Sequence, residues 1–127
     1  MKVLLDTHAF LWFMAGDTRL SPKARKVMSD ANTELLLSAA SVWEMAIKAA
    51  LGRLVLPVSV GDYIVGKVRN GLHIMPIEWM HAAAVQDMPT HHRDPFDRLI
   101  VAQAIAENLP LVSSDRLLKK YGLTLIW

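Results

Sequence analysis

The chain has 127 residues, of which 53% are hydrophobic and none is cysteine, so disulfide bonds and thiolate chemistry are excluded. Its formal charge of +2 and sequence pI of about 9.1 give a weakly basic balance that is compatible with a polyanionic partner. No apolar run approaches the roughly 20 residues that span a bilayer, and Asp6 and His8 interrupt the first apolar segment; we therefore expect one cytoplasmic domain over residues 1–127 with no membrane partner.

Short apolar runs alternate with helix-like segments along the chain. Two helix starts are marked clearly, because Ser21 and Asp94 are capping residues and each precedes a proline that fits the first helical position. Gly16 marks a helix end. In chain order we predict a strand over 2–6, helices over 7–16 and 21–31, a strand over 33–38, helices over 41–52 and 60–71, a strand over 72–77, helices over 78–88 and 94–108, a strand over 109–114, a short helix over 115–122 and a strand over 123–127.

The predicted strands are continuous apolar runs rather than alternating ones. Such runs are typical of parallel strands that are covered on both faces. Because these strands alternate with helices, the sequence predicts an α/β fold, a three-layer α/β/α sandwich around a mostly parallel central sheet.

Four acidic residues stand where a predicted strand gives way to a helix. Asp6 ends the first strand, Glu44 falls in the first turn of the helix predicted over 41–52, Asp97 follows the Asp94-Pro95 helix start, and Asp115 follows the strand over 109–114. In a parallel sheet all such junctions face one edge, where ligands bind. We therefore expect the four carboxylates to meet at one rim.

Each acid also has a purely structural explanation, because acidic side chains cap helix N-termini and complement the helix dipole. The segment from Ser41 to Glu44 matches a capping box, and Lys48 is placed to pair with Glu44. Asp115 could cap the short helix that follows it. Asp94, directly before Pro95, is explained completely as a cap.

Bringing several carboxylates together costs electrostatic free energy, and a helix-capping role alone does not explain why they would be brought together. Two carboxylates about 4 Å apart repel by on the order of 4 kcal/mol at an effective dielectric of 20. Several such pairs approach the roughly 5–15 kcal/mol that stabilises a domain, so such a rim must take up protons or a cation. Oxygen ligands favour Mg²⁺ or Mn²⁺, and the chemistry that fits is metal-assisted attack of water on a phosphodiester.

Four segments in order, LLDTHAFLW, SAASVWEMAIK, HRDPFDRLIVAQA and LVSSD, resemble the successive motifs of the PIN-domain ribonucleases. The match is closest to the VapC-type toxins of bacterial toxin–antitoxin pairs and extends over nearly the whole chain. The resemblance implies an α/β/α sandwich that cleaves RNA endonucleolytically with Mg²⁺ or Mn²⁺.

Carried over position by position, the resemblance implies that Asp6, Glu44 and Asp97 are the core metal-binding acids. Asp115 would be the fourth catalytic acid, holding a second ion or orienting water, and Ser113 matches a supporting hydroxyl. The resemblance also implies a homodimer and a cognate antitoxin whose tail covers the acidic groove.

Basic and aromatic residues near the acids are less specific. We expect Arg93, Arg98 and Arg116 to screen the carboxylates and to contact RNA phosphates. His91 and His92 adjoin the Asp94 helix start, and a solvated loop pair is the more frequent arrangement for such a pair than a metal site.

Two other functions compete with the ribonuclease. The fold could be a non-catalytic RNA- or protein-binding module whose acids are only caps. It could also be a phosphatase with an aspartyl-phosphate on Asp6, but such enzymes resemble the haloacid dehalogenases, which need a second Asp at the position that His8 occupies.

Overall fold

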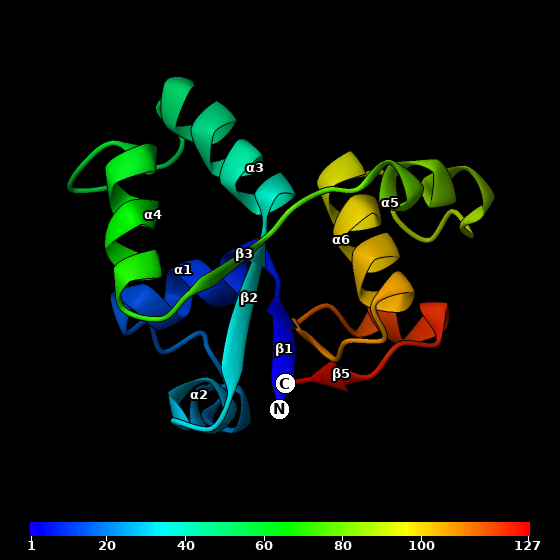
Figure 1. The fold of residues 1–127 in the computed structure, drawn as a ribbon, viewed down its shortest axis with the longest axis horizontal. Coiled ribbons are helices and arrows are strands. Elements are labelled where there is room, and N and C mark those ends of the chain that lie inside the picture. The colour runs from blue at the N-terminus through cyan, green and yellow to red at the C-terminus, as the bar shows by residue number, and fades with distance from the viewer.

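The computed structural model describes all residues from 1 to 127 and is built around a five-stranded parallel sheet (Figure 1). The strand order is β3-β2-β1-β4-β5, so the first strand of the chain is central and the chain adds strands to either side of it. The order therefore reverses between β1 and β4, which is the place where parallel sheets bind ligands. The strands are β1 (Lys2–Leu5), β2 (Glu34–Ser38), β3 (His73–Met75), β4 (Leu111–Val112) and β5 (Leu125–Ile126).

Helices cover both faces of the sheet, as predicted for a three-layer sandwich. On one face, α1, α2 and α4 pack against the larger hydrophobic cluster; on the other, α6 and a 3₁₀ helix, η2, pack against the smaller one. Helix α3 contacts α4, α6 and β2 and so reaches both sides (Figure 1). The helices are α1 (Thr7–Ala15), α2 (Pro22–Ser29), α3 (Ala39–Ala50), α4 (Val60–Arg69), α5 (Trp79–Ala84), η1 (Val85–Asp87), α6 (Pro95–Ala106) and η2 (Arg116–Tyr121).

Side chains of the central strand enter both cores. Val3 and Leu5 belong to the larger cluster, whereas Leu4 belongs to the smaller one, and all three are fully buried. This alternation follows from the period of two in a β-strand. A continuous apolar run is therefore required when both faces are covered. None of the helices has both the length and the apolar character needed to traverse a bilayer.

The boundaries of α3 differ from the prediction. The helix begins at Ala39 and is capped by Ser38, whose hydroxyl accepts a hydrogen bond from the Ala40 N–H. The proposed capping box from Ser41 to Glu44 is therefore wrong, and Glu44 lies beyond the first helical turn. The cause is a second serine three residues earlier, at the end of β2, which occupies the capping position.

Candidate active site

The predicted rim lies where β1 and β4 end side by side. Asp6 directly follows β1, and its backbone N–H donates to the Val112 carbonyl of β4 at 3.0 Å. Ser113 and Asp115 come immediately after β4. Residues more than a hundred positions apart in the chain are thereby held at one edge of the sheet by backbone pairing.

Asp6 is both a helix cap and a partner of Ser113. One carboxylate oxygen accepts from the His8 N–H at the start of α1 at 3.3 Å, and the other accepts from the buried Ser113 hydroxyl at 2.7 Å. The Ser113 oxygen in turn accepts from the Asp115 N–H at 3.2 Å. Ser113 therefore ties the segment after β4 to the acid after β1 and orients the Asp6 carboxylate.

Asp97 lies in the first turn of α6, which begins as the sequence predicted. The Asp94 side chain caps the helix by accepting from the Phe96 and Asp97 N–H groups, and Pro95 occupies the first helical position. Because Asp94 serves as the cap, the Asp97 carboxylate is free of that role and makes no hydrogen bond within the chain. It lines a small cavity together with Asp6, of about 10 Å³, close to the space that one water molecule needs.

The surroundings of Asp97 oppose its ionisation. Burial, followed by the negative charges of Asp94, Asp6 and Glu44, raises the pKa of Asp97 to about 7 from its ordinary value near 3.8. Asp6 and Glu44 are thus close enough to Asp97 for their charges to disfavour its ionised form. A carboxyl group that titrates near neutrality at the edge of a parallel sheet marks a candidate functional site.

Glu44 is almost fully buried and is held by side chains on two helices. Its carboxylate accepts from the Thr7 hydroxyl at 2.8 Å and forms the predicted ion pair with Lys48 at 2.7 Å. The Thr7 oxygen lies 2.9 Å from the Ser41 hydroxyl. Because Thr7 has a single proton and gives it to the carboxylate, Ser41 donates to Thr7, and the three side chains form one directed chain.

Asp115 is a cap, as one of the alternatives held, and also the partner of a histidine. One oxygen accepts from the Leu117 N–H at the start of η2, and the other lies 2.5 Å from His92 Nε2. His92 Nδ1 lies 3.0 Å from the Tyr121 hydroxyl. The expectation of a solvated histidine pair is therefore wrong for His92, whose side chain is mostly buried between Asp115 and Tyr121. Nothing in the local sequence pattern indicates this contact.

The three arginines expected to contact RNA differ in their surroundings. Arg93 and Arg116 are exposed and have no hydrogen-bond or ion-pair partner in the chain. The Arg98 guanidinium instead donates to four backbone carbonyls, those of Val85, Met88, Pro89 and His92. These contacts favour a structural role for Arg98, which holds the segment between η1 and α6 against α6.

Replacing Arg98 with alanine is expected to loosen that segment. The substitution leaves four carbonyls without their charged donor, and hydrogen bonds to charged groups contribute roughly 1.5–3 kcal/mol each at most. Amide hydrogen exchange of residues 85–93 should accelerate by at least about tenfold, while β1 and β2 keep their protection. Arg116→Ala, which removes an exposed arginine without partners, is the matched control. Unchanged exchange in Arg98→Ala would contradict the structural role.

The acidic side chains at this edge have the donor chemistry of a divalent-cation site. The candidate ligands are all carboxylate oxygens, which suit Mg²⁺ or Mn²⁺, and the repulsion at Asp97 is of the kind a cation relieves. No three acidic or histidine side chains are gathered into a ready-made coordination group, since Asp6, Glu44 and Asp115 are each held by protein partners. The residues therefore fit a hard cation in charge and chemistry, and Asp97 is the acid with no competing partner.

A family model described as the PIN domain matches residues 3–123. The chain is also 33% identical over 119 residues to ribonuclease VapC22 of Mycobacterium tuberculosis (strain ATCC 25618 / H37Rv), a match that covers 94% of this chain and 91% of that protein.

Two solved structures share the fold of this chain. VapBC2 from Rickettsia felis, bound to a DNA fragment from its promoter, contains a chain with a TM-score of 0.70 at 16% identity, covering 98% of this chain and 97% of that one. FitAcB from Neisseria gonorrhoeae gives a TM-score of 0.63 at 18% identity, covering 98% and 96%. At these identities the likeness establishes the fold and nothing further.

Proposed function

The chain belongs to the PIN-domain family, and from this membership we propose that it is a metal-dependent endoribonuclease that acts as the toxin of a toxin–antitoxin pair. The observation that carries the proposal is that Asp6 and Asp97 line one small cavity at the point where the strand order reverses. There a carboxyl group without a protein partner is kept near neutral pKa by burial and by neighbouring acids. The similarity to ribonuclease VapC22 supports RNA as the substrate.

Asp6, Asp97 and Glu44 are the residues that would hold Mg²⁺ or Mn²⁺, with Asp115 as the fourth acid. A bound divalent ion supplies Lewis-acid activation of water and offsets the charge that develops on the phosphodiester. The chain's own contribution is orientation. Ser113 fixes one oxygen of Asp6, and Thr7 and Lys48 fix the two oxygens of Glu44. These contacts hold the acids in place before any ligand arrives, which reduces the reorganisation needed for reaction.

In this proposal Asp115 contributes mainly by its place at the acidic rim and not by offering a free oxygen to the ion. Both of its oxygens are used by the chain, one by the Leu117 N–H and the other by His92, so it is the least free of the four acids. Arg93 and Arg116 are the arginines left available for RNA phosphates. Arg98 is the weakest of the three substrate-binding candidates because backbone carbonyls occupy its guanidinium.

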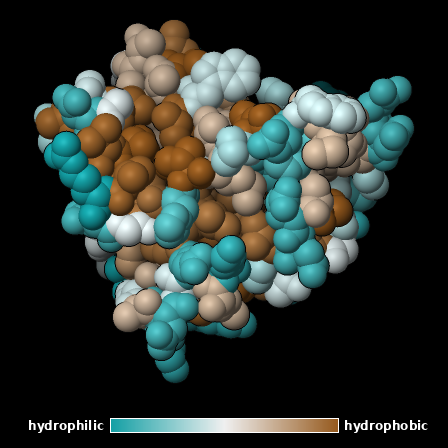
Figure 2. Space-filling view, viewed as in Figure 1, coloured by the Kyte–Doolittle hydropathy of each residue, from teal (hydrophilic) through white to brown (hydrophobic).

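A homodimer and an antitoxin are the proposed protein partners. Apolar side chains gather on the face over α3 and α4 (Figure 2). Among the exposed apolar residues, Val65 and Val68 belong to α4 and Leu51 directly follows α3. An apolar face of this kind marks a protein interface. The related solved structures are complexes of toxin-like and antitoxin chains, which supports the same arrangement here. We place the protein in the cytoplasm, where its RNA substrate and antitoxin are made. If no small protein encoded beside it co-purifies with it, the antitoxin proposal fails.

The first test uses purified protein, free of any partner, with labelled single-stranded and structured RNAs. Cleavage is expected with Mg²⁺ or Mn²⁺ and none in EDTA, because EDTA chelates the divalent cation that would activate water. Absence of cleavage over varied RNAs, by protein that binds them, would favour the non-catalytic binding module instead. The aspartyl-phosphate alternative is disfavoured, because the residue two positions after Asp6 is His8, which supplies no second carboxylate and whose ring packs against Trp12.

A further inference from the structure

A cavity of about 640 Å³ lies beside the acidic site and is formed by the end of α1, the segment from Arg53 to Pro57, and α4. Its lining combines apolar side chains, Leu11, Met14 and Leu54 among them, which we call the floor, with charged, mostly basic ones, which we call the rim. The inference drawn from it rests on the proposed ribonuclease function and concerns where the RNA strand lies.

The charged residues of the rim leave an excess of positive charge. The only acid among them, Asp17, is bound by Arg19 through its backbone N–H and its guanidinium, at distances down to 2.7 Å. That pairing lowers the pKa of Asp17 to about 2, so Asp17 stays ionised and is neutralised by Arg19. Arg53 and Lys67 have no acidic partner, and Lys67 is held over the Tyr63 ring at 4.9 Å. Two uncompensated cations therefore face one cavity.

The backbone at both ends of the cavity is fixed by helix-terminating motifs. At the end of α3, Gly52 has a positive φ of 72°, the Arg53 N–H donates to the Lys48 carbonyl and the Gly52 N–H to the Ala49 carbonyl. The end of α1 repeats this pattern at Gly16 and Asp17, where φ of Gly16 is 65°. This paired arrangement is the Schellman motif. The basic rim is consequently anchored to two helices rather than carried on a free loop.

Two residues belong to the cavity and to the acidic site together. Lys48 lines the cavity and donates to Glu44 at 2.7 Å, and His8 lines it while its backbone N–H binds Asp6. The cavity therefore opens directly beside the candidate ligands of the cation. A polyanion whose reacting phosphate lies at the acids can therefore extend past Lys48 into the cavity.

From this continuity we infer that the cavity is a nucleotide subsite, which holds a nucleotide of the RNA strand next to the cleaved bond, its phosphate on Arg53 and Lys67 and its base on the apolar floor. A phosphate bound by lysine and arginine, with a base packed nearby, is the ordinary way in which single strands are held. An acidic peptide would satisfy the same charges. The shared Lys48 favours the RNA, because a strand whose reacting phosphate lies at the acids also passes beside Lys48.

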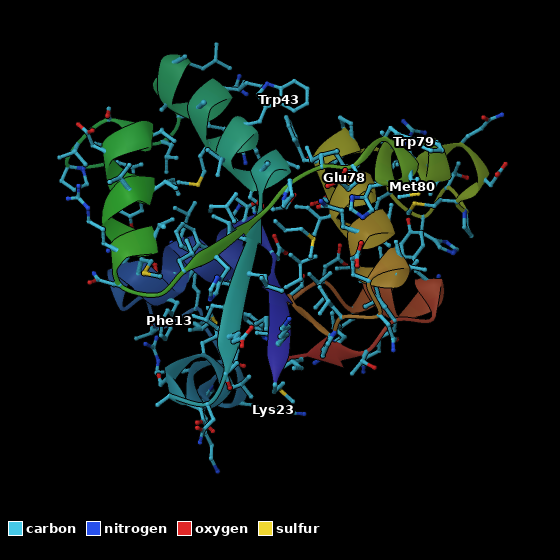
Figure 3. The ribbon with its side chains drawn as sticks, viewed as in Figure 1. Phe13, Lys23, Trp43, Glu78, Trp79 and Met80 are labelled. Carbon is cyan, nitrogen blue, oxygen red and sulfur yellow. The ribbon has the colours of Figure 1, made fainter.

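The test measures binding of a fluorescein-labelled single-stranded RNA by anisotropy in EDTA, where cleavage is absent. The variant Arg53→Glu/Lys67→Glu is compared with Lys23→Glu, which reverses an exposed charge on α2, far from α3 (Figure 3). We expect the double variant to bind about tenfold more weakly or worse and its salt dependence to fall by roughly one unit of slope. Lys23→Glu should change affinity less than about twofold. The RNA affinity of Arg53→Gln/Lys67→Gln, which only neutralises the cations, should lie between those of the other two variants. This milder variant guards against an effect of misfolding, and thermal melts check that all variants are folded.

The possible outcomes distinguish a failure of the nucleotide subsite from a failure of the proposed ribonuclease function. Wild-type cleavage with metal, together with weaker binding in both double variants, supports the inference. Wild-type cleavage with unchanged RNA affinity in both double variants overturns the subsite, leaves the ribonuclease standing and points to a protein segment as the occupant. Wild-type protein that neither cuts nor binds RNA overturns both. With metal present, the double variants should raise KM more than they lower kcat, because the altered residues do not touch the acids.

Discussion

Asp6→Asn and Asp97→Asn should each lower metal-dependent RNA cleavage by at least about a hundredfold, on the scale of losing one electrostatic element of an active site. Both carboxylates line the same small cavity, and each substitution removes one negative oxygen from the proposed cation site. The amide keeps the size and shape of the side chain, so the loss reports charge. The measurement is the initial rate on labelled RNA across a range of Mg²⁺ and Mn²⁺ concentrations.

Asp87→Asn is the matched control, since Asp87 lies at the end of η1, outside the β1–β4 edge, and its side chain has no partner in the chain. Its cleavage rate should remain within about twofold of wild type. Asp6→Asn has a second consequence: the amide nitrogen accepts no hydrogen bond, so one of the two donors that Asp6 binds, the Ser113 hydroxyl or the His8 N–H, loses its acceptor. Full activity in Asp6→Asn or Asp97→Asn, in protein shown to be folded, would remove the acidic rim from the mechanism.

The same Asp97→Asn variant should be more stable than wild type in the absence of metal at pH 8. Burial and the charges of Asp94, Asp6 and Glu44 disfavour the ionised carboxylate, and the amide removes that penalty. Relief on the order of 1 kcal/mol corresponds to a Tm higher by roughly 2–6 °C. A non-catalytic module whose acids are caps predicts the opposite change. Differential scanning calorimetry in EDTA decides between them.

The pH dependence of that gain has a definite sign. The pKa of Asp97 is about 7 in the folded chain and near 3.8 when unfolded, so between these values the folded state binds more protons. Stability then falls as pH rises from about 4 to about 7 and levels off above it. The advantage of Asp97→Asn should therefore be largest at pH 8 and vanish near pH 4. Adding Mg²⁺ should raise the Tm of wild type and much less that of the variant.

Asp94→Ala provides the contrast, because Asp94 caps α6 with hydrogen bonds to the Phe96 and Asp97 N–H groups. Its loss should cost about 0.5–2 kcal/mol, as is usual for N-cap residues. Two acids three residues apart would thus move stability in opposite directions. If both variants were destabilised alike, repulsion at Asp97 would be too weak to support the cation site.

The elements of the fold follow from local patterns that the sequence displays. Ser21 with Pro22 and Asp94 with Pro95 mark helix starts that the structure confirms, and the unbroken apolar strands require a parallel sheet covered on both faces. The start of α3 was misplaced because two serines, Ser38 and Ser41, can each act as a cap. Local sequence does not decide which serine is the cap, whereas the end of β2 at Ser38 does, because the helix follows directly.

The parts of the site that escaped prediction depend on contacts between distant segments. His92 reaches Asp115 across 23 positions, and Arg98 binds carbonyls of the segment before α6, including that of Val85. Neither contact has a periodic or motif signal. The placement of Asp6 and Asp115 at one edge was predictable for a different reason, since all the parallel strands end at the same edge and topology alone brings these two acids there.

The hydrogen bond from Ser113 to Asp6 joins residues 107 positions apart, and it has a consequence for how the protein is made. At roughly 5–20 residues per second, a ribosome needs about five to twenty seconds to translate the interval between them. Throughout that time β1 lacks β4, the neighbour on one of its sides, and Asp6 lacks the hydroxyl that orients it. The edge of the sheet that carries Asp6 is therefore completed only when most of the chain has been made, so a nascent chain that has not yet added β4 lacks the assembled acidic rim.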